Sequence, residues 1–274
     1  MKINLFSQAA LITLAAACSC GNSDERHEWR APGPDDRMFL TFTLSPTKEL
    51  IQIIHPVRSP CPGLNAMANH GFLPRSGRDI SLADFQKAIL SAYNYHPETL
   101  DQAFQQAIDF KLSTTGNVST FHLSDLNLHD AIEHDGSLSR SDFNLGDNHS
   151  FDPEVFAGVS ANLGLYDAGV DCEADLYVTV ETAAKARALR FQEAERLNPD
   201  FNASEAAVMG SVGETALYLT TLWDYAAGAA PKAWIRAFFE QERIPYLEGF
   251  KAPRTQRNLE TLAAMNQAIV AVKV

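Results

Sequence analysis

Apolar residues recur at intervals of three and four positions through most of the chain after residue 80, which is the spacing of helices with one buried face. Start signals support these helices, because Ser81 and Asp84 can form a capping box and Pro97 suits a first helical turn. No alternation of strands and helices interrupts the pattern. The chain therefore predicts a single all-α domain, with helices over 82–93, 97–110, 124–132, 152–166, 181–197, 204–224, 230–243 and, more weakly, 258–272.

The segment 38–57, MFLTFTLSPTKELIQIIHPV, departs from this helical pattern. It is apolar, rich in β-branched residues and uncapped, and it lies between two loop-like stretches. It is either a surface hairpin or a sequence foreign to the protein. The codons of Arg37-Met38 and Pro56-Val57 can hide a splice donor and a splice acceptor in one phase, so we hypothesise a retained intron. A strand in this place could displace the loop that follows it.

Charge excludes two classes of partner. The chain of 274 residues can bury a sizeable core, and its 22 basic and 34 acidic side chains give a formal net charge of −12. Such a surface repels nucleic acid and anionic lipid headgroups. We expect neither a nucleic-acid nor a membrane partner.

The first residues, MKINLFSQAALITLAAACSCGNS, predict a secretory signal peptide over residues 1–20. Lys2 precedes an apolar run that ends in small residues, and that run is too short to be a membrane span. A lipid anchor on Cys18 is an alternative. We therefore expect a secreted, extracellular protein.

Sequons and cysteines fit that compartment. Glycosylation sequons begin at Asn117, Asn148 and Asn202, and they are typical of a secreted glycoprotein. Beyond the leader only Cys61 and Cys172 remain, and a disulfide between them is one interpretation.

The surroundings of Cys61 favour a different interpretation. Pro60 and Pro62 restrict the backbone on both sides, and Pro62 can open a helix over GLNAMANHG. A thiolate at a helix N-terminus faces amide N–H groups, which lower its pKa below about 8.5. We expect such a thiolate to serve as a soft metal ligand.

A second cluster, HDAIEHDGSLSRSDFNLGDNHS over residues 129–150, gathers acidic side chains, a histidine and an arginine. One interpretation is a solvated acidic loop. Another is a calcium loop, because Asp135, Gly136, Leu138 and Asp142 match late EF-hand positions. Ala131 occupies the first ligand position of that pattern, which argues against calcium.

The third candidate is Glu214 in GSVGETALYLTTLWD, residues 210–224. Its neighbours on the predicted helix are apolar and small, so we expect a desolvated carboxyl with a raised pKa and a chemical task. A glutamate on the wet side of the helix is the alternative.

Together PCPGLNAMANHGFLPR, EHDGSLSR and GETALYL resemble the haem-thiolate chloroperoxidase and unspecific peroxygenase family, in the short branch with a PCP…EHD…E pattern. NPDF at 198–201 and WIRAFFEQERIPYLEGF resemble the family as well. The resemblance implies a helical chloroperoxidase-like domain over 58–250, with haem between a proximal loop and helix and the distal helices. It leaves 21–57 as a proline-rich N-terminal segment that contains the insertion, and 251–274 as a C-terminal tail.

The resemblance also implies roles for individual residues. Cys61 would be the axial ligand of haem b iron, and Glu214 the acid–base carboxylate, oriented by His134, which Asp135 would hold. Glu133 and Ser137 would bind Mg²⁺ or Mn²⁺ near a haem propionate, because their i, i+4 spacing can place both oxygens on one side of a turn. The distal-pocket positions fall on Ile132 and Leu217.

The activity implied is a peroxidase that uses hydrogen peroxide to oxygenate small organic substrates, with one-electron peroxidase activity as a side reaction. Halide oxidation of the chloroperoxidase type is the alternative within the family. A non-catalytic acidic cation-binding protein, with Cys61 joined to Cys172, is the alternative of another class. Gly136 stands where the family often has alanine, and we expect that difference to be harmless.

Overall fold

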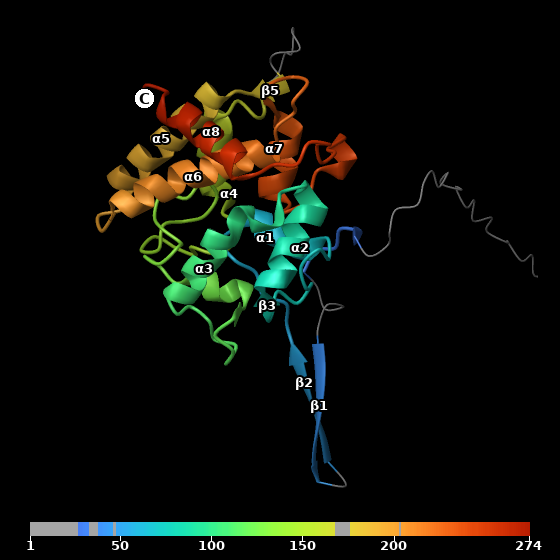
Figure 1. Cartoon of the computed structure of the whole chain (residues 1–274). Coiled ribbons are helices and arrows are strands. Elements are labelled where there is room, and N and C mark those ends of the chain that lie inside the picture. The colour runs from blue at the N-terminus through green and yellow to red at the C-terminus, as the bar shows by residue number, and fades with distance from the viewer. Residues whose placement is uncertain (1–26, 33–37, 46–47, 168–175, 203) are drawn as a thin grey trace, which may run out of the picture.

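The computed structural model describes residues 27–32, 38–45, 48–167, 176–202 and 204–274. The expected signal peptide, Cys18 and Cys172 lie outside these residues. Helices form most of the body (Figure 1), which confirms the all-α prediction: α1 (Pro62–Asn69), α2 (Leu82–Tyr93), α3 (Asp101–Asp109), α4 (Pro153–Asn162), α5 (Val180–Leu197), α6 (Glu205–Thr221), α7 (Lys232–Glu240) and α8 (Leu259–Val270). Short 3₁₀ helices are η3 (Pro97–Leu100), η4 (Leu123–Asn127) and η6 (Tyr246–Glu248).

Helix starts follow the local sequence. Ser81 and Asp84 form the predicted capping box on α2, and Asp152 accepts from the amides of the first turn of α4. Ser204 caps α6 by accepting from the Ala207 amide. These caps fix where each helix enters the body.

Two helix predictions are wrong in extent. The predicted helix over 124–132 is only the 3₁₀ helix η4, and residues 128–152 contain no helix. Asp130 adopts φ +61°, which a helix cannot accommodate. The predicted helix over 152–166 ends as α4 at Asn162, because Gly164 turns the chain with φ +61°.

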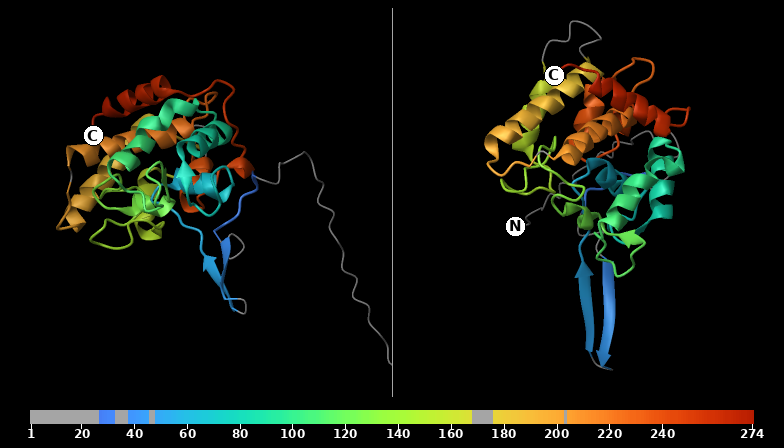
Figure 2. Two further views of the ribbon diagram at one scale, coloured as in Figure 1. Left: turned by 60° about the horizontal axis from the view of Figure 1, so that its bottom comes forward. Right: turned by 60° about the vertical axis from the view of Figure 1, so that its left-hand side comes forward.

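Helix α6 is central to the body. It packs against both α5 and α8, which also contact each other, while α1 packs against α7 and α2 against α3. Figure 2 shows the helical body from two further sides. One continuous apolar core joins these pairs. The chain after residue 250, which we assigned to a tail, belongs to this body, because α8 covers α6 and Arg257 is only 1% exposed.

Two-residue strand pairs close the loops. β3 (Ile80–Ser81) pairs antiparallel with β4 (Thr120–Phe121), and β5 (Tyr177–Val178) pairs antiparallel with β6 (Ala230–Pro231). Among the described residues, only β1 (Met38–Ser45) and β2 (Lys48–Ile54) form longer strands. No helix of the described chain is both long and apolar enough to cross a membrane.

The atypical segment forms an antiparallel hairpin, β1–β2, in which Met38 is opposite Ile54. Figures 1 and 2 show this hairpin projecting away from the helical body in every view. The chain on either side of the hairpin contacts the region after Cys61, since Arg30 donates its amide to the Asn69 carbonyl at the end of α1 and Val57 donates to the Ser76 carbonyl. The hairpin therefore does not displace the loop that carries Cys61.

The irregular chain over 128–152 is held by buried polar groups. Asp142 is fully buried, and its Oδ1 accepts from Arg190 Nη2 on α5 and, at 3.0 Å, from the Gly136 amide. Gly136 has φ +80°, and a Cβ there would lie 2.8 Å from the Phe191 ring. The glycine thus suits this chain, whereas an alanine here would meet both the left-handed backbone and the Phe191 ring.

Deleting residues 38–57 is expected to leave helical content and cooperativity unchanged, because a lone hairpin adds little stability and the removal costs the described core only the partly buried Val57. The melting temperature should move by less than about 4 °C in circular dichroism, whereas removing α8 should abolish cooperative melting. Loss of cooperative melting on deleting 38–57 would contradict this expectation.

Amplifying spliced transcripts tests the intron hypothesis, which fails if every transcript retains the segment.

Gly136→Ala is expected to lower the free energy of unfolding by about 2–4 kcal/mol, the sum of left-handed strain and overpacking against Phe191. Gly116→Ala is the matched control, since Gly116 has φ +81° and no atom lies within 4 Å of its Cβ position. The control should cost only about 1–2 kcal/mol. Equal losses in urea titrations of both variants would show that the ring contact is unimportant.

Candidate active site

Cys61 is the N-cap residue of α1, with Pro62 in the first turn as predicted. Cys61 is free, and the residue as a whole is half-buried while its sulfur lies inward. The backbone N–H groups of Gly63 and Leu64 donate toward the sulfur. A thiolate at Cys61 would therefore be stabilised by two amide donors at the start of a helix.

The pKa of the Cys61 thiol is nevertheless raised, contrary to expectation. Burial of the thiol is the largest cause, and it outweighs the lowering by the Leu64 amide. The nearby Glu214 carboxylate adds to the rise, and Gly63 and Arg140 oppose it. In the protein alone the thiol form is favoured, so a cationic metal centre would have to stabilise the thiolate.

A buried network fixes the loop that carries Cys61. Asn65 Oδ1 accepts from the Ser59 amide at 2.9 Å, and Asn65 Nδ2 donates to the Ser59 carbonyl and to Glu242 Oε1, both at 2.8 Å. Glu242 Oε1 also pairs with Arg140 Nη2. Arg140 belongs to the EHDGSLSR stretch, so the network ties the cysteine loop to the second predicted cluster.

Glu214 lies on α6, and its Oε2 is 3.6 Å from His134 Nε2. The structure thus brings together the two residues predicted to form the acid–base pair. The Glu214 side chain is 56% exposed, so the expected desolvation is wrong: the neighbouring small residues leave the carboxylate uncovered by protein. An uncovered carboxylate remains available to a ligand.

His134 is buried, and its Nδ1 donates to the main-chain carbonyl of Asp135 at 2.7 Å, because a carbonyl can only accept. Its Nε2 is directed toward Glu214. Burial alone would lower the His134 pKa, but Glu214, the Asp135 carbonyl and Glu133 raise it to about 9. Gly210 on α6 lies beside the ring, and a Cβ there would be in ordinary van der Waals contact with it at 3.5 Å.

The Asp135 carboxylate has a different partner from the one expected. Its Oδ1 accepts from the Phe143 amide, and its Oδ2 accepts from Asn198 Nδ2, both at 3.0 Å. Asp135 therefore holds His134 through its main chain, while its side chain fixes the loop. With the Asp135 and Asp142 carboxylates both engaged in these bonds, the calcium-loop alternative loses its ligands.

Glu133 is buried, and the main cause of its raised pKa is that burial, which hydrogen bonds from His129 and Asn148 oppose. His129 Nδ1 lies 2.8 Å from Glu133 Oε2, while Oε1 has no hydrogen-bond partner among the described residues. Ser137 Oγ donates to the His134 carbonyl at 3.3 Å. The described residues contain no group of three or more acidic, histidine or cysteine side chains able to hold a metal, so a cation at Glu133 needs oxygen ligands of other kinds.

The two predicted pocket residues are partly buried and pack against the core. Leu217 follows Glu214 by one turn on α6, and Ile132 directly precedes Glu133.

Sequence reasoning missed His129 and Asn198 as partners of site residues. His129 stacks on Phe143, with ring centroids 4.5 Å apart, and is fixed beside Glu133. The i, i+4 spacing of His129 and Glu133 could have revealed His129 as a partner of Glu133. Asn198 is the first residue of the NPDF stretch.

These groups fit a thiolate-bound haem. A thiol flanked by two amide donors, with an uncovered carboxylate near enough to affect its pKa, provides both a soft ligand for iron and a proton acceptor. The unpartnered Glu133 Oε1 is the kind of atom that a cation satisfies.

Comparisons with known proteins give the same family. The family model for "Peroxidase, family 2" matches residues 27–255. An aromatic peroxygenase of Coprinellus radians is 31% identical over 53% of this chain, and a chloroperoxidase of Leptoxyphium fumago is 27% identical over 79%. An aromatic peroxygenase of Cyclocybe aegerita is 24% identical over 84% of this chain.

The chain covers 59%, 60% and 59% of the lengths of these relatives, respectively. The matched region nevertheless extends over most of the chain and includes Cys61, His134 and Glu214. The chain therefore belongs to the family 2 peroxidases, the haem-thiolate chloroperoxidase family.

Proposed function

We propose that this chain is a secreted haem-thiolate enzyme that uses hydrogen peroxide to oxygenate small organic substrates. The observation that carries the proposal is the thiol of Cys61, held at a helix start by two amide donors and electrostatically coupled to Glu214, which is paired with His134. Two of these relatives are named aromatic peroxygenases, which supports oxygenation as the first candidate. The third is named a chloroperoxidase, so halide oxidation is the second candidate.

Cys61 would hold the haem iron, and the bound haem would supply the oxidising chemistry toward peroxide and substrate. Glu214 Oε2 would take a proton from one oxygen of hydrogen peroxide and return it to the other, so that water can leave. His134 Nε2, 3.6 Å away, would orient that carboxylate, and the Asp135 carbonyl would orient the imidazole in turn. Each of these groups acts from a fixed position, which favours the proton transfer.

A divalent cation, Mg²⁺ or Mn²⁺, would bind beside Glu133. The unpartnered Oε1 of this buried carboxylate supports the proposal, since a buried oxygen without a donor is costly. Ser137 Oγ would contribute a second hard oxygen ligand.

Secretion is proposed from the leader sequence over residues 1–20. Asn117 and Asn202 are exposed and suit glycan attachment. Asn148 is 8% exposed, and its Nδ2 donates to the Asn127 carbonyl, so the folded chain does not present it as an acceptor.

Cys61→Ser is expected to abolish the strongly red-shifted Soret band that cysteinate-bound haem shows after reduction with dithionite under carbon monoxide. Cys172→Ser is the control and should keep the band. The spectrum should be recorded with and without residues 38–57. If neither form binds haem and a Cys61–Cys172 disulfide is found, the cation-binding alternative replaces the enzyme.

Glu214→Gln is expected to lower the rate of peroxide cleavage by about 100-fold to 10,000-fold, because the amide cannot accept the proton. The red-shifted haem band should remain, since Cys61 is untouched. Glu205→Gln, an exposed change in the first turn of the same helix, is the control for stopped-flow measurements. A variant that keeps most of the wild-type rate would remove Glu214 from the mechanism.

A further inference from the structure

A pocket of about 610 Å³ lies where the end of α6, the start of α7 and the loop after η6 meet. Two of the chain's three tryptophans line it. The other residues of interest in its lining are Tyr225, Asp224, Lys251 and Arg254. Trp234 is held in orientation because its indole N–H donates to the Glu248 carbonyl at 2.9 Å.

The charge of this pocket is opposite to that of the whole protein. Asp224 Oδ1 accepts from the Ala226 amide at 2.9 Å and so caps the turn. No carboxylate of the described chain pairs with Lys251 or Arg254, although the full sequence has a net charge of −12. Unpaired cations beside indole and phenol rings suit a flat aromatic molecule that carries negative charge.

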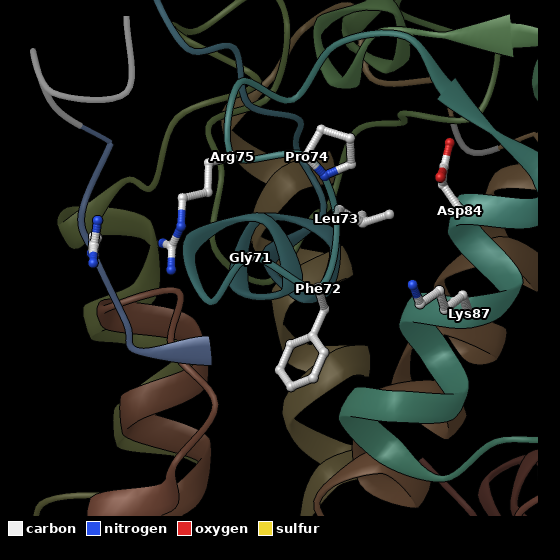
Figure 3. A pocket seen from close by; sticks show the side chains of 8 residues that line it. Gly71, Phe72, Leu73, Pro74, Arg75, Asp84 and Lys87 are labelled. Carbon is white, nitrogen blue, oxygen red and sulfur yellow. The ribbon is translucent and has the colours of Figure 1, made fainter. Parts of the chain in front are cut away.

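A second hollow, of about 620 Å³, shows what distinguishes the first. Figure 3 shows Lys87 and Asp84 on α2 on one side of it and Arg75 on the other. There both arginines are engaged: Arg75 donates to the Asn69 and Glu28 carbonyls, and Arg30 lies 3.7 Å from Glu28. This hollow has no tryptophan in its lining and serves as a comparison.

Aromatic rings connect the tryptophan pocket to Cys61. The Trp234 and Phe250 ring centroids are 5.1 Å apart, and those of Phe250 and Tyr93 are 6.4 Å apart, both edge to face. Tyr93 is buried, and its pKa is raised chiefly by burial and in part by the charge of nearby Cys61. The rings thus extend inward from the pocket wall to the neighbourhood of the thiol.

Helix α7 gives a second connection. Trp234 and Phe238 are four residues apart and share one face of α7. The Phe238 ring lies 3.3 Å from the Cβ position of Gly63, and the Cys61 sulfur lies 3.8 Å from the same point. Indole is far more easily oxidised than a phenyl ring, so Trp234 can give up an electron while Phe238 and Phe250 cannot. The two phenyl rings only fill the space between Trp234 and the Cys61 side and so shorten the gaps that an electron must cross.

We propose that this pocket binds anionic aromatic molecules and that Trp234 passes one electron at a time from them toward the Cys61 side of the protein. The inference rests on the proposed function, because hydrogen peroxide, acting through the haem, is the oxidant. Two aromatic anions each lose one electron and become radicals. The peroxide oxygens gain these two electrons and two protons, the O–O bond breaks, and two waters form.

Binding is tested with the disulfonated benzothiazoline dye ABTS, by quenching of tryptophan fluorescence in the protein as purified. Lys251→Glu should weaken binding about tenfold, since it replaces an attraction by a repulsion. Lys87→Glu, the same charge change in the comparison hollow, should leave the affinity unchanged. Equal affinities in all three proteins, or equal losses in both variants, would overturn the proposal.

The electron route is tested in the haem-containing enzyme by comparing two rates with peroxide, ABTS oxidation and oxygenation of neutral naphthalene. Trp234→Phe keeps an aromatic ring but removes the indole, so the ratio of the first rate to the second should fall about tenfold. Trp29→Phe changes the tryptophan outside the pocket and should leave the ratio unchanged. An unchanged ratio in Trp234→Phe would overturn the route.

The two tests separate this inference from the proposed function. If the wild-type protein neither binds haem nor oxygenates naphthalene, the proposed function fails, while the fluorescence titration still measures the pocket. If the protein binds haem and oxygenates naphthalene but its affinity for ABTS does not depend on Lys251, only the further inference fails.

Discussion

The buried Asp142 carboxylate is the constraint on which the arrangement of the candidate active site depends. Residues 128–152 have no helix of their own, yet they carry Glu133 and His134. Asp142 accepts from Arg190 on α5 and from the Gly136 amide, and it is fully buried. Removing one partner of such a pair leaves an uncompensated charge inside the protein, which costs about 3–5 kcal/mol. A stretch of chain without regular structure is thereby held as firmly as a helix.

A second polar network joins the two halves of the site. Glu242 accepts from Asn65 beside the cysteine loop and pairs with Arg140 from the histidine loop. Both halves therefore share one carboxylate, although they are far apart in the sequence. Their relative position is set by directional bonds more than by apolar packing, which is less specific about angle and distance.

The sequence predicted the helices well because the energy of a helix is local. The spacing of apolar residues, the capping box at Ser81 and the proline after Cys61 all act within a few residues of their effect. Local surroundings singled out Cys61 and Glu214, and the family resemblance gave these two residues and His134 their roles. The structure brings His134 and Glu214 together.

Properties that depend on distant partners were not predicted. The pKa of Cys61 rises because burial by the whole fold exceeds the effect of its own helix start. Asp135 is adjacent to His134 in sequence, but its carboxylate is directed toward Asn198 on another element. The need for glycine at position 136 arises from Phe191, more than 50 residues later, and no local pattern reveals that ring.

The packing of α8 on α6 has a consequence for the order of events during synthesis. Helix α6 carries Glu214, and α5 covers only part of that helix until α8, which begins at Leu259, has left the ribosome. Arg257, buried just before α8, donates to the carbonyls of Tyr93 and Thr221 and so locks this late segment to earlier ones. The nascent chain therefore presents its cysteine loop long before the Glu214 carboxylate has a fixed position.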